Sequence, residues 1–196
     1  MKAYIKKEIF DSKKGLPALF LDRDGVINFN YGYVCDKNNF DFIPGIFELL
    51  LTAKKKEYLI VIVTNQAGIG RGYYSENQFK KLTIWMVEEF QSRNIDIDAV
   101  FYSPFHPTAG IGKYLLEEDT RKPGSGMFFE ATRELNIDIN NSIMIGDNIS
   151  DMDASINAGI NNNFLVKNNS NILLKDRFYE NVNCVSSLDK IIIGSY

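Results

Sequence analysis

Five short apolar runs alternate along this chain with four longer segments of helical periodicity. The apolar runs, which predict buried strands, are Ala18–Leu21, Leu59–Val63, Ala99–Tyr102, Ile143–Ile145 and Phe164–Val166. The helical segments lie near Gly45–Lys56, Ser75–Arg93, Gly126–Leu135 and Ile149–Ala158. Buried strands that are separated by helices are typical of a mostly parallel sheet covered on both faces. The sequence therefore predicts a three-layer, Rossmann-like α/β fold with a central parallel sheet.

The ends of two helices carry recognisable signals. Ser75 and Gln78 form the pattern of a capping box, and Asn94 and Gly159 stand where helix-ending residues belong. The length of 196 residues suits one sizeable core, and no linker or repeat divides the chain. We therefore expect a single domain over residues 1–196. The two segments expected to be loops are Asn28–Phe42 and Ser103–Gly124.

The composition excludes several functional classes. A hydrophobic share of 45% and a charged share of 24% are typical of a globular protein, and a net charge of −3 does not favour a broad nucleic-acid-binding surface. No apolar stretch is long enough to span a bilayer, and the first residues lack the apolar core of a secretory signal. The two cysteines, Cys35 and Cys184, form no Cys-x-x-Cys pair. We expect a cytoplasmic, monomeric protein with a small-molecule partner and with neither nucleic acid nor membrane as a partner.

Two carboxylates stand at the end of the first apolar run. Asp22 and Asp24 are separated by one residue, and side chains along a strand alternate with period two, so both point the same way. At the carboxyl edge of a sheet, where open α/β folds bind ligands, one carboxylate can attack a phosphorus atom while its neighbour carries the proton. The residues Asp22–Gly25 have the pattern Asp-x-Asp-Gly, which also occurs in calcium loops and in ordinary turns. The apolar residues that follow Gly25 do not fit the later ligand positions of an EF-hand.

Three further motifs follow three other strand ends. The segment Thr64–Gly72 offers a hydroxyl and glycine-freed backbone amides that suit phosphate oxygens. Arg121 and Lys122 precede Pro123, which can begin a helix and would place both cations near its positive end. Asp147 adds a third carboxylate, and three acidic oxygens with waters and a phosphate oxygen suit Mg²⁺ rather than zinc.

Each motif also has a purely structural interpretation. Thr64-Asn65 can cap a strand, and Arg121-Lys122 can be a solvated surface pair. Asp147 can cap the helix after it, and Asp151 fits a role in which it holds loop amides or a lysine. These interpretations must hold independently at successive strand ends to explain the whole pattern, so we favour one shared site.

The order of these motifs resembles the haloacid dehalogenase superfamily of phosphotransferases. The resemblance spans about Leu19 to Ala158, and it is closer to the branch of heptose-bisphosphate and histidinol-phosphate phosphatases. The segments that carry the closer match are Asp22–Asn28, Gly32–Val34, Phe40–Ile43, Thr64–Gly72 and Arg121–Pro123. Of these, Gly32–Val34 and Arg71-Gly72 favour the heptose-bisphosphate phosphatases.

The resemblance implies a role for each matching residue. Asp22 is the nucleophile that forms an aspartyl-phosphate, and Asp24 is the acid and base. Thr64 and Lys122 stabilise the transferring phosphoryl group. Mg²⁺ is held by Asp22, the backbone carbonyl of Asp24, and Asp147. The positions that match substrate contacts are Asn30, Tyr31, Gly32, Tyr33, Asn65, Gln66, Ala67, Arg71, Arg121 and Asn148.

Two departures from the family pattern stand out. Relatives commonly carry a zinc-stapled loop before Arg-Lys-Pro. Here the four expected ligand positions are Ser103, Phe105, Glu118 and Thr120. Four-coordinate zinc cannot be assembled from these, so we expect no structural zinc. The residues expected to replace the metal by packing are Phe105, Ile111, Tyr114, Leu115 and Leu116, and His106 is expected to be a hydrogen-bonding loop residue. The second departure is Asn148, where relatives often have lysine.

The resemblance therefore implies an Mg²⁺-dependent phosphatase without a large cap domain. Its implied substrate is the 7-phosphate of D-glycero-D-manno-heptose 1,7-bisphosphate. Histidinol-phosphate hydrolysis is the enzymatic alternative, because histidinol phosphatases share several of these motifs. The loss of lysine at Asn148 weakens one anchor for an anionic substrate. A non-catalytic sugar-phosphate-binding module is the weaker alternative, since both Asp22 and Asp24 are present.

Overall fold

The computed structural model describes residues 1–6, 15–167 and 180–194. Its strands form one seven-stranded sheet in the order β1-β4-β3-β2-β5-β6-β7, parallel throughout except for the antiparallel pair β1 and β4. The strands are β1 (Lys2–Ile5), β2 (Ala18–Leu21), β3 (Leu59–Asn65), β4 (Ala99–Ser103), β5 (Ile143–Gly146), β6 (Asn162–Val166) and β7 (Val182–Val185). The helices are α1 (Ile46–Lys55), α2 (Ala67–Gly70), α3 (Glu76–Gln91), α4 (Gly126–Leu135) and α5 (Ile149–Asn157), with short 3₁₀ turns η1 (Lys37–Asn39), η2 (Gly112–Tyr114), η3 (Ile139–Asn141) and η4 (Leu188–Lys190).

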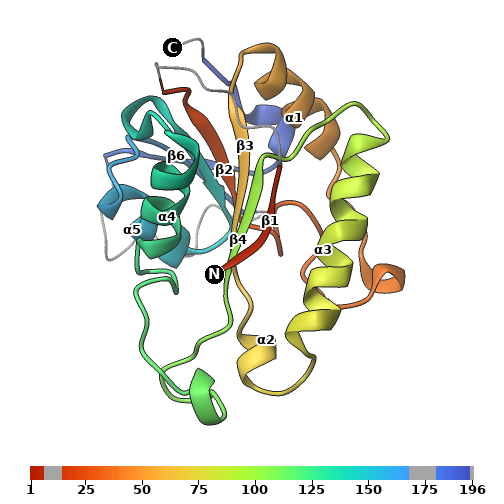
Figure 1. Ribbon diagram of the computed structural model, residues 1–196. Helices are drawn as coiled ribbons and strands as arrows, with labels where there is room; N and C mark the ends of the chain where they lie inside the picture. Colours follow the sequence, from red (N-terminus) through yellow and green to blue (C-terminus); the bar gives the residue numbers. More distant parts are fainter. Residues whose placement is uncertain (7–14, 168–179, 195–196) are drawn as a thin grey trace.

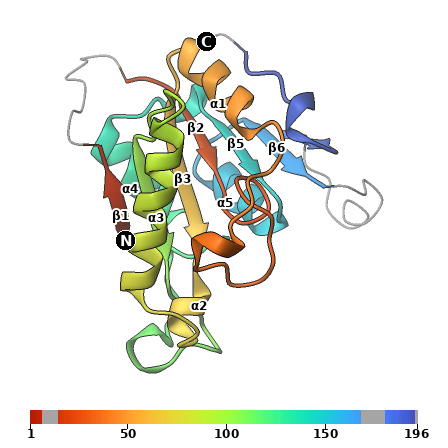
Figure 2. The same ribbon diagram turned by 90° about the vertical axis from the view of Figure 1, so that its right-hand side faces the viewer.

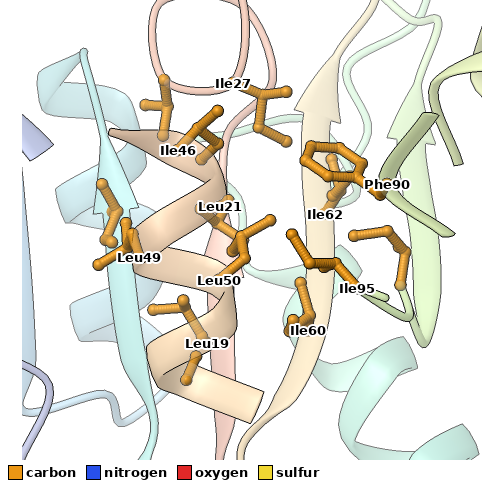
Figure 3. Close-up of a cluster of buried hydrophobic side chains, with 14 of the residues drawn as sticks. Leu19, Leu21, Ile27, Ile46, Leu49, Leu50, Ile60, Ile62, Phe90 and Ile95 are labelled. Atoms are coloured by element: carbon orange, nitrogen blue, oxygen red, sulfur yellow. The ribbon is translucent and has the colours of Figure 1, made fainter. Parts of the chain in front are cut away.

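Helices cover both faces of the sheet, which confirms the three-layer α/β fold (Figure 1). β2 illustrates why, because all four of its side chains are fully buried and alternate between two cores. Leu19 and Leu21 pack toward α1 and α3, while Ala18 and Phe20 pack toward α4 and α5. Figure 3 shows the core that contains Leu19 and Leu21, where Leu50 of α1 lies beside Leu21 and faces the strand of Ile60 and Ile62.

The five expected strands and four expected helices are all present, with ends that shift by a few residues. The capping box of Ser75 and Gln78 is confirmed, and Asn94 and Gly159 have the positive φ angles (59° and 98°) expected where helices end. One expectation is wrong. Pro123 does not begin α4, which starts at Gly126 after Ser125, so the two cations before Pro123 do not sit in its first turn.

Besides the 3₁₀ turns, two strands and one α-helix were not expected from the sequence. They are the edge strands β1 and β7 and the single-turn helix α2. Between β2 and α1 the chain forms only a flap containing η1, and between β3 and β4 it forms only α2 and α3, so neither described segment holds a large cap domain. No helix among residues 1–6, 15–167 and 180–194 is long and apolar enough to cross a membrane. All described strands join one sheet, and the expected single domain over the whole chain stays a prediction.

Candidate active site

The carboxyl ends of three parallel strands bring distant residues together. Leu21 of β2 is in register with Ile62 of β3 on one side and Ile145 of β5 on the other. The backbone N–H of Asp22 continues this pairing by donating to the carbonyl of Ile145 at 3.0 Å. The residues that follow each strand therefore meet at one edge of the sheet, toward which β3 points in Figure 2, beside α2 and the flap.

A pocket of about 550 Å³ opens at this edge. The expected site residues that line it are Asp22, Asp24, Asn30, Gly32, Tyr33, Asn65, Gln66, Ala67, Arg71, Arg121, Lys122, Asp147 and Asn148. Four further lining residues were not expected as site residues: Gly68, Tyr74, Ser150 and Asp151. Two expected residues do not line it. Thr64 is buried behind the surface, and exposed Tyr31 instead donates its hydroxyl to Asp41 at 3.0 Å.

Lys122 is the buried cation at the floor of the pocket. Its ammonium lies 2.8 Å from Asp22 Oδ1 and 2.6 Å from Asp151 Oδ1, and it donates to the Val63 carbonyl at 2.8 Å. Burial lowers the pKa of this ammonium, but the charges of Asp151 and Asp22 outweigh burial and raise it above its ordinary value. Lys122 therefore stays charged and fixes one oxygen of Asp22.

The floor nevertheless carries more negative than positive charge. Burial raises the pKa of the Asp22 carboxyl to about 7, against the opposing effect of Lys122. Burial also raises the pKa of Asp147 to about 6, and the nearby charge of Asp151 adds to the shift. One ammonium thus faces three carboxylates, and a second cation would relieve the repulsion among them.

The donor set fits a hard divalent cation. Carboxylate oxygens of Asp22, Asp147 and Asp151 lie within 4.8 Å of one another. Carboxylate oxygen is the ligand type that Mg²⁺ prefers. Gly25, with a φ of 95°, leaves room for Asp147, because a Cβ at this position would collide with the Asp147 carboxylate.

Asp151 has the structural role expected of it. Its Oδ1 holds Lys122, and its Oδ2 accepts from the backbone N–H groups of Asp147 (3.2 Å) and Asn148 (3.0 Å). Asn148, not Asp147, caps α5, since its side chain accepts from the backbone N–H of Ser150 at 3.2 Å. Asp147 is therefore left to face the pocket.

The segment after β3 holds the other parts of the site in place. Asn65 clamps the backbone of Lys122, donating to its carbonyl at 3.0 Å and accepting from its N–H at 3.1 Å. Gln66 donates to Thr64 Oγ1 at 2.9 Å and to Asp24 Oδ2 at 3.0 Å, and it accepts from the Tyr74 hydroxyl at 2.5 Å. Thr64-Asn65 does more than cap a strand.

Asp24 has an additional neighbour that sequence reasoning missed. The Arg23 side chain is buried and contacts both carboxylate oxygens of Asp24, at 2.9 and 2.8 Å. A charged residue between two carboxylates, directly after a fully apolar strand, was the available signal. The pairing of Arg23 with Asp24 was not predictable from the sequence. The position of the Arg23 side chain also depends on the carbonyl of Val34 in the flap, 2.7 Å away.

Two guanidinium groups lie at the rim of the pocket. Among the described residues, no carboxylate pairs with Arg71 or Arg121, and Arg71 Nε is buried without a hydrogen-bond partner. Arg121 donates to the carbonyl of Phe105 at 3.1 Å. Burial lowers the pKa of Arg121, and the neighbouring charge of Arg71 lowers it further. The Arg71 guanidinium also lies over the Tyr33 ring, 5.8 Å from its centroid.

His106 does not neutralise this pair of cations. Its Nδ1 accepts from the backbone N–H groups of Thr108 (3.2 Å) and Ala109 (3.1 Å), so the neutral ring carries its proton on Nε2. His106 Nε2 lies 3.1 Å from Arg71 Nη2, so two hydrogen-bond donors face each other. Burial lowers the pKa of His106, and the charges of Arg121 and Arg71 add to the effect. His106 is thus a loop residue with hydrogen bonds to its own loop, as expected.

In the loop Ser103–Gly124, some residues at the positions where relatives carry zinc ligands contact one another or their neighbours. Thr120 donates to Ser103 at 3.5 Å, and the rings of Phe105 and Tyr114 lie 6.1 Å apart. The expectation of a larger apolar cluster is wrong. Three of its expected members are exposed at the surface: Ile111 (65%), Leu115 (52%) and Leu116 (46%).

Comparison with known proteins agrees with this geometry. Residues 21–177 match the family described as polynucleotide kinase 3 phosphatase. The chain is 48% identical over 151 residues to the D-glycero-beta-D-manno-heptose-1,7-bisphosphate 7-phosphatase of Vibrio cholerae, covering 77% of this chain and 81% of the relative. It is also 48% identical over 149 residues to the alpha-anomer 7-phosphatase of Burkholderia mallei, covering 76% and 79%. The chain belongs to the heptose-bisphosphate phosphatase branch of the haloacid dehalogenase superfamily.

A solved structure supports the assignment of the fold. The D,D-heptose 1,7-bisphosphate phosphatase from B. bronchiseptica, complexed with magnesium and phosphate, superposes with a TM-score of 0.75 at 24% identity, covering 88% of this chain and 94% of that chain. The family match and the curated relatives confirm the resemblance noted from the motifs. As a member of this branch, the chain is a phosphatase, an enzyme that hydrolyses phosphate monoesters.

Proposed function

We propose that this phosphatase removes the 7-phosphate of D-glycero-D-manno-heptose 1,7-bisphosphate and that it depends on Mg²⁺. The observation that carries the proposal is one pocket with a carboxylate nucleophile at its floor and, at its rim, two guanidinium groups that have no carboxylate partner among residues 1–6, 15–167 and 180–194. The floor accounts for the chemistry, and the rim accounts for a substrate with a second phosphate. The names of the curated relatives support the same substrate.

The reaction begins at Asp22. Lys122 holds its Oδ1, so Oδ2 is the oxygen that attacks phosphorus. As the new O–P bond forms, the bond from phosphorus to the sugar oxygen breaks. The sugar oxygen keeps the electron pair of the broken bond and receives a proton from Asp24. Water then attacks the aspartyl-phosphate, giving its proton to Asp24 and releasing inorganic phosphate from Asp22. Lys122 and Thr64 stabilise the charge on the transferring group.

Asp22, Asp147 and the backbone carbonyl of Asp24 would hold Mg²⁺, which offsets the repulsion between the carboxylates and the incoming phosphate. The surplus negative charge at the floor supports this assignment. So does the ligand reported for the B. bronchiseptica enzyme, which was solved with magnesium and phosphate.

The second phosphate of the substrate fits the rim. Arg71 and Arg121 present donors that lack carboxylate partners in the described part of the chain. Guanidinium groups bind phosphate through paired hydrogen bonds and remain charged at all relevant pH values. Since curated relatives at the same identity act on the alpha or the beta anomer, both anomers are candidates.

Steady-state kinetics tests the proposal. The kcat/KM of each anomer of heptose 1,7-bisphosphate should exceed that of histidinol phosphate by about tenfold or more, since one additional phosphate–guanidinium contact has to supply only about 1.4 kcal/mol for a tenfold difference. A preference for histidinol phosphate moves the assignment to that substrate, and failure to hydrolyse any phosphate monoester favours a binding module. The cytoplasmic location, the monomeric state and the absence of structural zinc remain predictions.

A further inference from the structure

Arg23 is a buried cation whose one ionic partner in the described part of the chain is Asp24. Its side chain is 2% exposed, and its Nη2 contacts both oxygens of Asp24 and the carbonyl of Val34. Its guanidinium also lies 5.7 Å from the centroid of the Phe79 ring. Its Nε and Nη1 have no hydrogen-bond partner in the part of the chain that the structure describes. Burying an incompletely satisfied charge costs stability, so this arrangement is not explained by folding alone.

The contact controls a soft torsion. The carboxylate of an aspartate rotates easily about its Cβ–Cγ bond, because this sp³–sp² torsion has broad minima. Asn28 and Gln66 each bind one oxygen of Asp24, both at 3.0 Å. Among the described residues, Arg23 is the donor that bridges both oxygens, and it carries charge, which strengthens its hydrogen bonds. Arg23 therefore fixes the plane of the carboxylate.

We propose that Arg23 is a positioning residue that orients Asp24 for proton transfer to the leaving oxygen. This inference rests on the proposed function, in which Asp24 supplies that proton. A sugar alkoxide is a poor leaving group and needs the proton as the P–O bond breaks. A nitrophenolate leaves without it. Misplacing Asp24 should therefore slow the sugar phosphate far more than an aryl phosphate.

The test compares two substrates within each variant. For Arg23→Met and Arg23→Lys, kcat/KM is measured on p-nitrophenyl phosphate and on heptose 1,7-bisphosphate, with Mg²⁺ present. The ratio of aryl to sugar activity should rise about tenfold or more in Arg23→Met, up to the ~10²–10⁴ that general acid catalysis supplies. It should rise less in Arg23→Lys, which keeps the charge. Because both activities come from the same folded molecules, the ratio does not depend on how much protein folds.

Two controls separate positioning from damage and from the proposed function. Leu82→Ala opens a cavity at a buried position of α3 and should lower stability without changing the ratio. Asp24→Asn should raise the ratio at least as far as Arg23→Met. If Asp24→Asn raises it and neither Arg23 variant does, the Arg23 inference is overturned while the proposed function stands. If Asp24→Asn leaves it unchanged, the acid role of Asp24 is wrong. Should Arg23→Met not fold, the lysine variant decides: any rise of the ratio above that of the parent supports the inference, and an unchanged ratio overturns it.

Discussion

The Lys122 ammonium lies 2.8 Å from the Asp22 carboxylate, although the two residues are 100 positions apart in the chain. Neither motif that contains them is informative alone, because each has an ordinary structural interpretation. The contact exists because β2 and β3 are adjacent and parallel, and because Asn65 at the end of β3 clamps the backbone of Lys122. Fold and chemistry therefore depend on the same ion pair.

Replacing this lysine should damage both stability and turnover. Lys122→Met leaves Asp22 and Asp151 as buried carboxylates without their cation, and breaking a buried pair in this way costs about 3–5 kcal/mol. Chemical denaturation should show that loss, and kcat should fall by orders of magnitude. Lys113→Met, at an exposed lysine, is the matched control and should change neither quantity appreciably. An Lys122→Met protein as stable as the parent would contradict the importance of the pair.

Removal of the nucleophile should abolish turnover and spare the fold. Asp22→Asn keeps the shape of the side chain and leaves Lys122 paired with Asp151. We expect no measurable phosphatase activity and a denaturation midpoint close to that of the parent. In the parent, EDTA should remove activity and added Mg²⁺ should restore it, whereas no amount of Mg²⁺ should restore Asp22→Asn. Full activity in the variant, or in chelated parent protein, would sink the mechanism.

The central strands were predictable because their apolar composition indicates burial. β2 through β6 consist largely of apolar residues, and turn-forming or helix-forming segments bound them. The edge strands β1 and β7 carry Lys2 and Asn183 among half-exposed positions, so no buried run marks them. Their place depends on pairing with β4 and β6, which is a property of the assembled sheet.

The candidate site shows a similar division. Residues directly after strands, such as Asp22 and Asp147, were predictable because parallel strands share an edge. Arg23 was missed, because its partners Asp24 and Val34 meet only when the flap folds back. The prediction that Pro123 begins a helix was wrong, because Gly124 and Ser125 separate Pro123 from the first residue of α4. Local pattern identifies the strand ends, and tertiary contacts decide what each side chain does there.

The loop that carries Arg121 is tied to α3 through Glu76, and this tie should depend on pH. The hydroxyl of Tyr114, above all, lowers the pKa of the Glu76 carboxyl, and together with the hydroxyl of Tyr102 it outweighs the opposite effect of burial. Because the folded pKa lies below the unfolded value of about 4.5, the stabilisation is present above pH 4.5 and is lost as pH falls through the folded pKa.

Glu76→Gln should remove this dependence. The difference in unfolding free energy between the parent and Glu76→Gln should be constant above about pH 5.5 and should shrink as pH falls below the unfolded pKa. Glu88→Gln, at an exposed position of the same helix, should show no comparable trend. Denaturation curves between about pH 3 and pH 7 would measure it, because this range spans the unfolded pKa of the Glu76 carboxyl. A difference that grows toward low pH would contradict the assignment.

Structural zinc should be absent. The four positions where relatives carry zinc ligands hold Ser103, Phe105, Glu118 and Thr120, and two of them contact each other directly. Elemental analysis of protein purified without added zinc should find far less than one equivalent. A zinc-selective chelator should leave the thermal midpoint unchanged, because no zinc-binding free energy supports folding. About one equivalent of tightly bound zinc, or a chelator-induced fall in the midpoint, would show that this prediction is wrong.

Substrate choice should respond to position 148, where lysine is common in relatives. Asn148 lines the pocket and also caps α5 through the backbone N–H of Ser150. Asn148→Lys should therefore have two opposite effects. It loses the cap, which costs about 1 kcal/mol of stability, and it adds a cation beside the bound sugar phosphate, which should lower KM for the bisphosphate by several-fold at low salt. Asn148→Ala is the matched control, with the same loss of the cap and no added charge.

The complementary change, Arg71→Met, should raise KM for the bisphosphate more than for a monophosphate, whereas Arg133→Met on the exposed face of α4 should affect neither. If Asn148→Lys and Asn148→Ala change KM alike, the remote phosphate does not reach this end of the pocket, and the rim cations alone must hold it.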